Sequence, residues 1–130
     1  MSAIIHHLLD AAPVPVAPFS HAVEVDGWVF VTGQIPENPE HGDDPLPVGI
    51  EAQTRRVMEN LKLVLSRIGL GLERVVLARV FIIDMREFET MNKIYASYFP
   101  PNKRPARTCI GVTGLAKGAR VEIDFIARRP

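Results

Sequence analysis

Residues 107–125 constrain the fold of this chain more than any other stretch, because apolar and polar side chains alternate along them. This period of two is typical of β-strands with one buried face. With residues 114–117 as the turn, two antiparallel strands pair Cys109 with Glu122, and directly paired residues share a face of the sheet. The polar face of this predicted C-terminal hairpin carries Arg107, Cys109, Glu122 and Asp124. Its apolar face is the predicted core side: Thr108, Ile110, Val112, Val121, Ile123 and Phe125.

The composition is typical of one globular domain over residues 1–130, with 47% hydrophobic and 23% charged residues. A formal net charge of zero argues against a general binder of nucleic acid or of anionic membranes. The charge is nevertheless uneven, since residues 1–50 contain no Lys or Arg and residues 101–130 contain seven. Either these two segments pair with each other, or the basic one frames a pocket for an anionic small molecule.

Nothing in the sequence predicts secretion, a membrane span or a cofactor. The N-terminus lacks a basic and apolar leader, and no apolar run approaches the roughly 18 residues of a membrane helix. Cys109 is the only cysteine, which excludes an internal disulfide and a cysteine-based zinc site and favours a reducing, cytoplasmic setting. The adjacent pair His6–His7 lacks metal-ligand spacing, so no metal, nucleotide or flavin is predicted.

The whole chain predicts an α+β fold with two helices on one sheet. Residues 1–17 are a proline-rich, extended lead-in, and residues 37–47 are an acidic surface loop. Asp26–Gly27 is a strong signal for a two-residue hairpin turn. The predicted order is strand 21–25, strand 28–33, helix 48–68, strand 75–83, helix 86–99 and the C-terminal hairpin. The sheet face without helices stays exposed unless subunits assemble.

Four short motifs in the right order carry a resemblance to a known family. They are Val-Thr-Gly-Gln-Ile-Pro at 31–36, Arg-Pro-Ala-Arg-Thr-Cys at 104–109, Val-Glu-Ile at 121–123, and a spaced series from Asn60 to Tyr95. From about Pro18 to Arg128 the chain resembles the RidA (YjgF) family of imine deaminases, to which an endoribonuclease L-PSP label is also attached. The resemblance implies a chorismate-mutase-like homotrimer whose sheets form a central barrel, with sites in the clefts between subunits.

The resemblance gives catalytic roles to Arg107 and Glu122. Arg107 matches the arginine that binds the carboxylate of a 2-imino or 2-enamino acid, a task suited to the paired N–H donors of a guanidinium. From the residues alone, an ion pair between Arg107 and Asp124 is the alternative. Glu122 matches the glutamate that holds or activates water. A neighbouring arginine would lower the pKa of this carboxyl, whereas burial would raise it.

Five further residues are predicted to bind substrate: Phe19, Thr32, Gly33, Asn92 and Cys109. Thr32 keeps a hydroxyl where many family members have serine, Gly33 lets a ligand approach the backbone, and Asn92 matches a pocket-edge asparagine. Phe19 departs from the tyrosine common in deaminating members and lacks its hydroxyl. At Cys109 the resemblance implies a contribution from the backbone amide. A lone cysteine on a strand is in any case more typical of apolar packing than of nucleophilic catalysis.

The resulting prediction is hydrolytic deamination of reactive 2-imino or 2-enamino acids to 2-oxo acids and ammonia, without a cofactor. One alternative is a related enamine deaminase that acts on 3-aminoacrylate-like substrates. Another is a non-catalytic trimer that binds a small ligand. Cleavage of RNA has little support, because neutral charge and few aromatic residues among the basic ones make a poor RNA groove.

Overall fold

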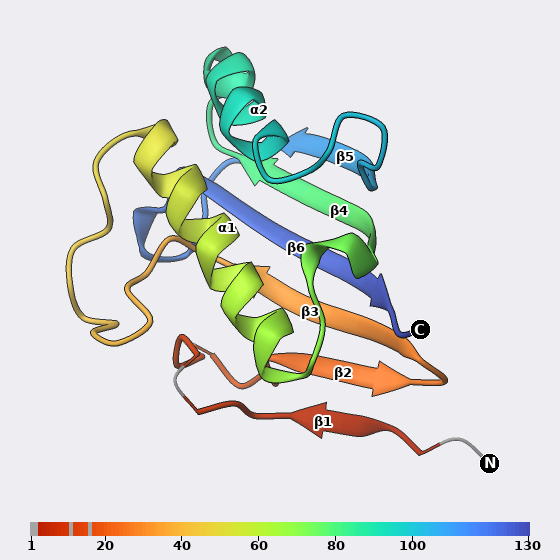
Figure 1. The fold of residues 1–130 in the computed structure, drawn as a ribbon. Coiled ribbons are helices and arrows are strands. Elements are labelled where there is room, and N and C mark those ends of the chain that lie inside the picture. The colour runs from red at the N-terminus through yellow and green to blue at the C-terminus, as the bar shows by residue number, and fades with distance from the viewer. Residues whose placement is uncertain (1–2, 11, 16) are drawn as a thin grey trace.

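The structure, a computed structural model, describes residues 3–10, 12–15 and 17–130. Its elements are β1 (Ile5–His7), β2 (Ala22–Val25), β3 (Trp28–Gln34), α1 (Ile50–Arg67), β4 (Val75–Ile82), α2 (Phe88–Ala96), β5 (Ala106–Gly111) and β6 (Val121–Arg128). The six strands of the described residues form one mixed sheet in the order β1-β2-β3-β6-β4-β5. Both helices lie on the same face of that sheet (Figure 1). The predicted α+β class, with two helices on one sheet, is confirmed.

The N-terminal lead-in contains a strand that the sequence did not predict. Ile5–His7 pairs antiparallel with β2, with Ile5 opposite Glu24. Three residues are too few to show an alternating pattern, so the partner strand, rather than the segment itself, decides this pairing. The five predicted strands therefore become six within the described ranges, and β1 forms one edge of the sheet. Residues 1–2, 11 and 16 of the predicted lead-in lie outside the described residues.

The hairpin of β2 and β3 agrees with its sequence signal. Val25 pairs with Trp28, as predicted from the turn at Asp26–Gly27. Both turn residues have positive φ, 52° at Asp26 and 79° at Gly27, which is the backbone that a type I′ turn requires. Later in β3 the pairing with β6 shifts register between Val31 and Gln34, so that a bulge falls on Thr32 and Gly33.

The predicted C-terminal hairpin is wrong. Its two strands exist, but β4 lies between them: β5 runs parallel to one side of β4, and β6 runs antiparallel to the other. The physical reason is that β4, α2 and β5 form a strand–helix–strand crossover, in which a helix joins two parallel neighbours. Cys109 and Ile123 are thus both opposite Val80, and Cys109 does not pair with Glu122.

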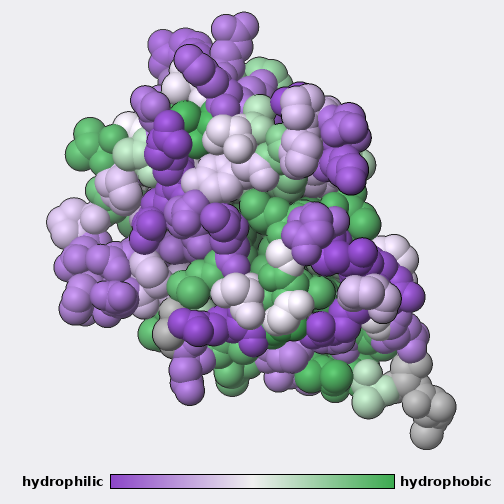
Figure 2. All heavy atoms as spheres, in the orientation of Figure 1, coloured by the Kyte–Doolittle hydropathy of each residue, from purple (hydrophilic) through white to green (hydrophobic). Residues whose placement is uncertain are grey.

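The core fills the space between the helices and one face of the sheet. The predicted stripe of α1 is fully buried at Val57, Leu61, Val64 and Leu65. From α2, Met91 and Tyr95 are buried, and beyond its end the ring of Phe99 packs edge-on against Phe125 of β6. Of the predicted core side of the hairpin, Val121, Ile123 and Phe125 are buried, whereas Thr108 and Ile110 are exposed. Hydrophilic residues dominate the outer surface on the helix side (Figure 2).

The opposite face of the sheet is not covered within this chain. It exposes large apolar side chains, with relative exposures of 42% at Trp28, 45% at Phe30 and 46% at Ile110. The strand at 75–83 was expected to be covered on both faces, and within one chain only the helix side of β4 is covered. Neither helix in the described ranges has the length and apolarity needed to cross a membrane.

Candidate functional site

Arg107 lies on the helix side of β5, beside aromatic rings from α2. Its guanidinium carbon is 5.0 Å from the ring centre of Tyr95 and 5.6 Å from that of Phe88. The alternative ion pair with Asp124 is wrong, because Asp124 binds Arg79 through two hydrogen bonds of 2.6 and 3.0 Å. In the described part of the chain, no carboxylate lies within ion-pair distance of Arg107. The N–H fork is therefore free to bind an anion.

Arg107 lines a pocket of about 240 Å³, and two residues of the same lining have buried polar atoms without partners. Asn92 and Tyr95 line it, and the buried Asn92 Oδ1 and Tyr95 hydroxyl have no hydrogen-bond partner. Burial raises the pKa of Tyr95 to about 12, so its hydroxyl stays protonated and can donate. Buried polar atoms normally have partners, so these two mark a place where a ligand or water would bind.

Glu122 lines a second pocket, of about 320 Å³, together with Phe19, Thr32 and Gly33. These are four of the seven predicted site residues, which the structure brings together. Glu122 is half-buried, and its burial, assisted by the negative charge of Asp124, raises the pKa of the carboxyl above its ordinary value. Of the two opposite effects expected on this pKa, burial therefore prevails, since Arg107 is on the other side of the sheet.

Gly33 is the position that lets the Glu122 side chain lie against β3. A Cβ built at Gly33 would overlap Glu122 Oε2 and lie 3.0 Å from the carboxyl carbon. The bulge at Thr32 and Gly33 brings this part of β3 beside the carboxylate. Phe19 is 38% exposed and contributes an aromatic wall without a hydroxyl. Gly33 was predicted to let a ligand approach the backbone, whereas in the structure it is the Glu122 side chain that lies close to this position.

Cys109 lies on the same side of the sheet as Arg107, half-buried against the core. Burial raises the pKa of its thiol, and the nearby charge of Arg107 opposes this only in part. The thiol is therefore protonated at neutral pH and is a poor nucleophile. This agrees with the expectation that its side chain packs rather than reacts.

The predicted site residues fall into two groups on opposite faces of the sheet. Directly paired residues share a face, so Arg107 lies on the same face as Ala78 and Phe125. Glu122 is out of phase with Phe125 and faces the other way, toward the sheet side without helices. The single polar patch predicted from the hairpin is thus wrong. Within one chain, Arg107 and Glu122 do not face a common ligand.

A sequence model of the family described as endoribonuclease L-PSP matches residues 9–129, which is most of the chain. The chain belongs to the endoribonuclease L-PSP family. This is the YjgF/RidA family that the motifs indicated, so the resemblance is confirmed.

Relatives and solved structures of the L-PSP family match the chain over most of its length. A RutC family protein of Aquifex aeolicus is 41% identical over 117 residues, which are 89% of this chain and 92% of the relative. The structure of YyfA from Yersinia pestis, a Rid family protein, has a TM-score of 0.91 at 37% identity and covers 98% of this chain and 100% of its own. Escherichia coli TdcF, solved with bound serine, has a TM-score of 0.87 at 31% identity, with coverages of 95% and 98%. Membership of this family supports a general role in removing reactive imines or enamines of small molecules.

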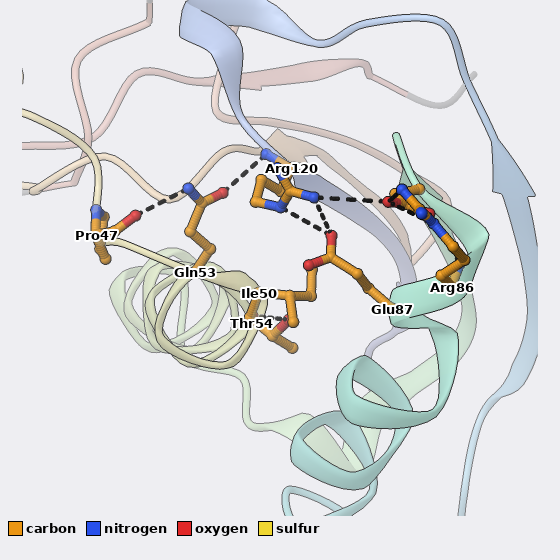
Figure 3. Close-up of polar contacts among 8 residues, drawn as sticks. Pro47, Ile50, Gln53, Thr54, Arg86, Glu87 and Arg120 are labelled. Atoms are coloured by element: carbon orange, nitrogen blue, oxygen red, sulfur yellow. Dashed lines mark hydrogen bonds and ion pairs between the residues drawn. The ribbon is translucent and has the colours of Figure 1, made fainter.

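In this L-PSP family chain, Arg120 fixes the start of the strand that carries Glu122. Its backbone N–H donates to Gln53 Oε1 at 2.8 Å, and its guanidinium lies 2.6 Å from Glu87 Oε1 (Figure 3). Gln53 also donates to the carbonyl of Pro47 at 2.9 Å, at the end of the loop before α1 (Figure 3). Sequence reasoning missed this network because Arg120 is 67 residues from Gln53 and 33 from Glu87, with no local signal to connect them.

The acidic segment at 37–47 was predicted to be a loop, and it contains no helix or strand. It forms part of the Glu122 pocket. Lys117 binds this loop, with Nζ 3.1 Å from Glu37 Oε2 and 3.0 Å from the carbonyl oxygen of Gly42. The Glu37 side chain is nearly buried and lines the pocket. The basic C-terminal third thus pairs with the acidic N-terminal part at this point, one of the two readings that the charge pattern left open.

Two histidines of this L-PSP family chain, His21 and His7, make hydrogen bonds within the fold. His21 is buried and links the N-terminal segment to the sheet, because its Nδ1 accepts from the Leu9 N–H at 2.9 Å and its Nε2 lies 2.6 Å from the Pro13 carbonyl oxygen. His7 bonds to Glu24 at 3.1 Å. Among the residues the structure describes, no three His, Cys, Asp or Glu side chains gather at a distance suitable for a metal ion.

Proposed function

We propose that this protein hydrolyses reactive 2-imino or 2-enamino acids to 2-oxo acids and ammonia. The observation that carries the proposal is the Arg107 pocket, in which a guanidinium without a carboxylate partner lies beside two buried polar atoms without partners. Such a pocket suits a small carboxylate ligand. Among small carboxylates, family membership supports reactive imines and enamines as the substrate class.

The working site would be shared between copies in a homotrimer, with Arg107 from one copy and Glu122 from the next. Two features favour this arrangement. Arg107 and Glu122 face opposite sides of one sheet, and the open side exposes Trp28, Phe30 and Ile110. Large apolar side chains exposed on one face of a sheet are typical of an interaction surface, and a closed ring of copies is the simplest symmetric way to cover it.

In the proposed mechanism, Arg107 binds the substrate carboxylate and so fixes the imine carbon in position. Glu122 accepts a proton from water, which attacks that carbon; the C=N bond becomes single, and after proton transfer to nitrogen ammonia leaves as the C=O bond forms. The pKa of Glu122, raised by burial, brings this base closer to neutral pH, where proton transfer is most efficient. Backbone N–H groups near Cys109 and Gly33 orient the ligand. Positioning and one acid–base group suffice, because such imines already hydrolyse in water.

Two alternatives use the same pocket. A 3-aminoacrylate-like enamine would place its carboxylate on Arg107 in the same way, and Phe19, with no hydroxyl, leaves room for a different partner at the reacting end. A non-catalytic role in binding a small ligand is the second; the bound serine of TdcF favours it, because serine offers the same carboxylate.

The direct test measures release of the 2-oxo acid from 2-iminopropanoate, which an amino-acid oxidase generates in the assay. Arg107→Ala should abolish acceleration and leave the fold intact, because the side chain makes no ion pair in the described structure. Arg67→Ala, at the exposed end of α1, is the matched control and should keep full activity. Full turnover in a folded Arg107→Ala protein would refute the mechanism.

Mixing variants tests the shared site. Arg107→Ala and Glu122→Gln proteins are each expected to be inactive, but co-refolding them in equal amounts should restore about a quarter of wild-type activity, the fraction of clefts that receive both native groups in a randomly mixed ring. Activity that stays at zero after mixing, with exchange of copies verified by mass, would place both groups in a site within one chain and contradict the shared arrangement.

A further inference from the structure

A second arginine, Arg104, lines the same pocket as Arg107. It is exposed, and no carboxylate of the described residues lies within ion-pair distance of it. Its positive charge, like that of Arg107, opposes the rise in the pKa of the Tyr95 hydroxyl that burial causes. The pocket therefore holds two cationic groups, whereas the carboxylate of a 2-imino monocarboxylic acid neutralises one.

We propose that Arg104 binds a second acidic group of the ligand, so that the preferred substrates are 2-imino dicarboxylic acids, the imines of acidic amino acids. The inference rests on the proposed function for the reaction, but the two-arginine pocket exists independently of it. Arg107 holds the carboxylate next to the imine carbon, and Arg104 holds the carboxylate at the far end of the side chain.

The size of the pocket fits such a ligand, and the sequence limits the distance between the two arginines. Two residues three positions apart have Cα atoms at most about 11 Å apart, and a long arginine side chain can shorten the gap between the two guanidinium groups. At about 240 Å³ the pocket is smaller than those that hold drug-sized molecules, and it suits a metabolite of a few carbon atoms. Like charges in one pocket repel, so an anion that bridges Arg104 and Arg107 gains from both.

The buried polar groups at the pocket, which also support the proposed function, indicate what kind of ligand it would bind. Tyr95 is only 4% exposed, and its hydroxyl, which lacks a partner, can donate to a carboxylate oxygen. Asn92 Oδ1 is also buried without a partner and can accept only from an N–H or O–H group. A ligand with carboxylates and an imine N–H supplies both kinds of group. A purely apolar ligand would leave both atoms unpaired, at a cost in binding free energy.

The test compares two imines that differ at the far end, 2-iminoglutarate and 2-iminobutanoate, each generated by an amino-acid oxidase. Wild type should show the higher kcat/KM on 2-iminoglutarate, and Arg104→Met should lower that value about 10-fold, the contribution of a charge-assisted hydrogen bond. The variant should keep its activity on 2-iminobutanoate. Lys103→Met, an exposed neighbour that does not line the pocket, is the control and should leave both values unchanged. The preference should shrink as salt is added, because Arg104 is exposed.

Binding of the products separates this inference from the proposed function. Calorimetry with 2-oxoglutarate and 2-oxobutanoate measures the dicarboxylate preference without turnover. A preference that Arg104→Met removes supports the subsite even when no imine is hydrolysed, in which case only the proposed reaction fails. Equal binding of the two products, or a preference that survives Arg104→Met, overturns the subsite. If the protein nevertheless hydrolyses 2-iminobutanoate, the proposed reaction holds and only the Arg104 subsite is refuted.

Discussion

Gly33→Ala should abolish activity without weakening the fold. The φ of Gly33 is not in the left-handed region, so alanine can adopt this backbone. Its Cβ would overlap Glu122 Oε2 and lie 3.0 and 3.2 Å from the next two carbon atoms of that side chain. The glutamate side chain must therefore turn away from β3, and its carboxylate moves by more than the tolerance of a hydrogen bond to the reacting water.

The magnitudes of the two effects differ widely. Replacing glycine by alanine in a strand stabilises by about 0.5–1 kcal/mol, and a strained rotamer of Glu122 costs about the same, so the free energy of unfolding should change by less than about 1 kcal/mol. Misplacing a general base costs about 10²–10⁴-fold in rate. A fold that stays intact while turnover falls by about 100-fold or more is thus the expected result.

The assay combines thermal unfolding with 2-oxo acid release from 2-iminopropanoate. Gly114→Ala is the matched control, because a Cβ at Gly114 meets no atom within 4 Å and its φ is not positive. It should match wild type in both measurements. Turnover within about twofold of wild type in Gly33→Ala would show that the position of the Glu122 carboxylate does not matter, and would remove this residue from the mechanism.

Three further predictions concern other residues. Phe19→Tyr, which restores a hydroxyl at the pocket wall, should preserve or raise turnover of 2-iminopropanoate; a collapse in the same assay would mean that the pocket is shaped for another substrate. In the wild type, kcat/KM should rise with pH through the raised pKa of Glu122. In denaturant titrations, Glu122→Gln should be more stable than wild type at neutral pH, because the folded state holds the charged carboxylate unfavourably. Glu24, nearly buried beside Arg129 and His7, has its pKa lowered from 4.5 to about 2, so its stabilisation is present above pH 4.5 and is lost as the pH falls toward 2. Glu24→Gln should therefore cost about 2 kcal/mol of unfolding free energy at pH 7 and nothing near pH 2, and a constant difference across that range would contradict the assignment.

Local signals in the sequence predicted the parts of the fold that depend on neighbouring residues. The stripe of Val57, Leu61 and Leu65 gave the buried face of α1, because helical spacing alone sets which side chains share a face. The Asp26–Gly27 turn fixed the register of β2 and β3 for the same reason, since two positive φ values leave one pairing. Neither feature depends on residues distant in the sequence.

The C-terminal strands show where local reasoning fails. Residues 107–125 alternate as a hairpin would, but the strand between β5 and β6 comes from residues 75–82, far earlier in the chain. The spacing of strand 75–83, helix 86–99 and the following strand was a usable signal, because a helix between two strands favours a parallel crossover. Since a change of one position moves a side chain to the other face, the pairing error placed Arg107 and Glu122 on one patch.

Arg107 and Glu122 lie on opposite faces of the sheet, and under the proposed assembly this has a genetic consequence. A chain contributes Arg107 to one cleft and Glu122 to another, so a chain that lacks both groups spoils both of the clefts that it borders. Expressed with equal amounts of wild type, such a double variant should leave about a quarter of the activity per cleft, whereas a single variant should leave about half. Only an allele that lacks both groups would then act in a dominant-negative manner, and two alleles that each lack a different group could complement each other within one cell.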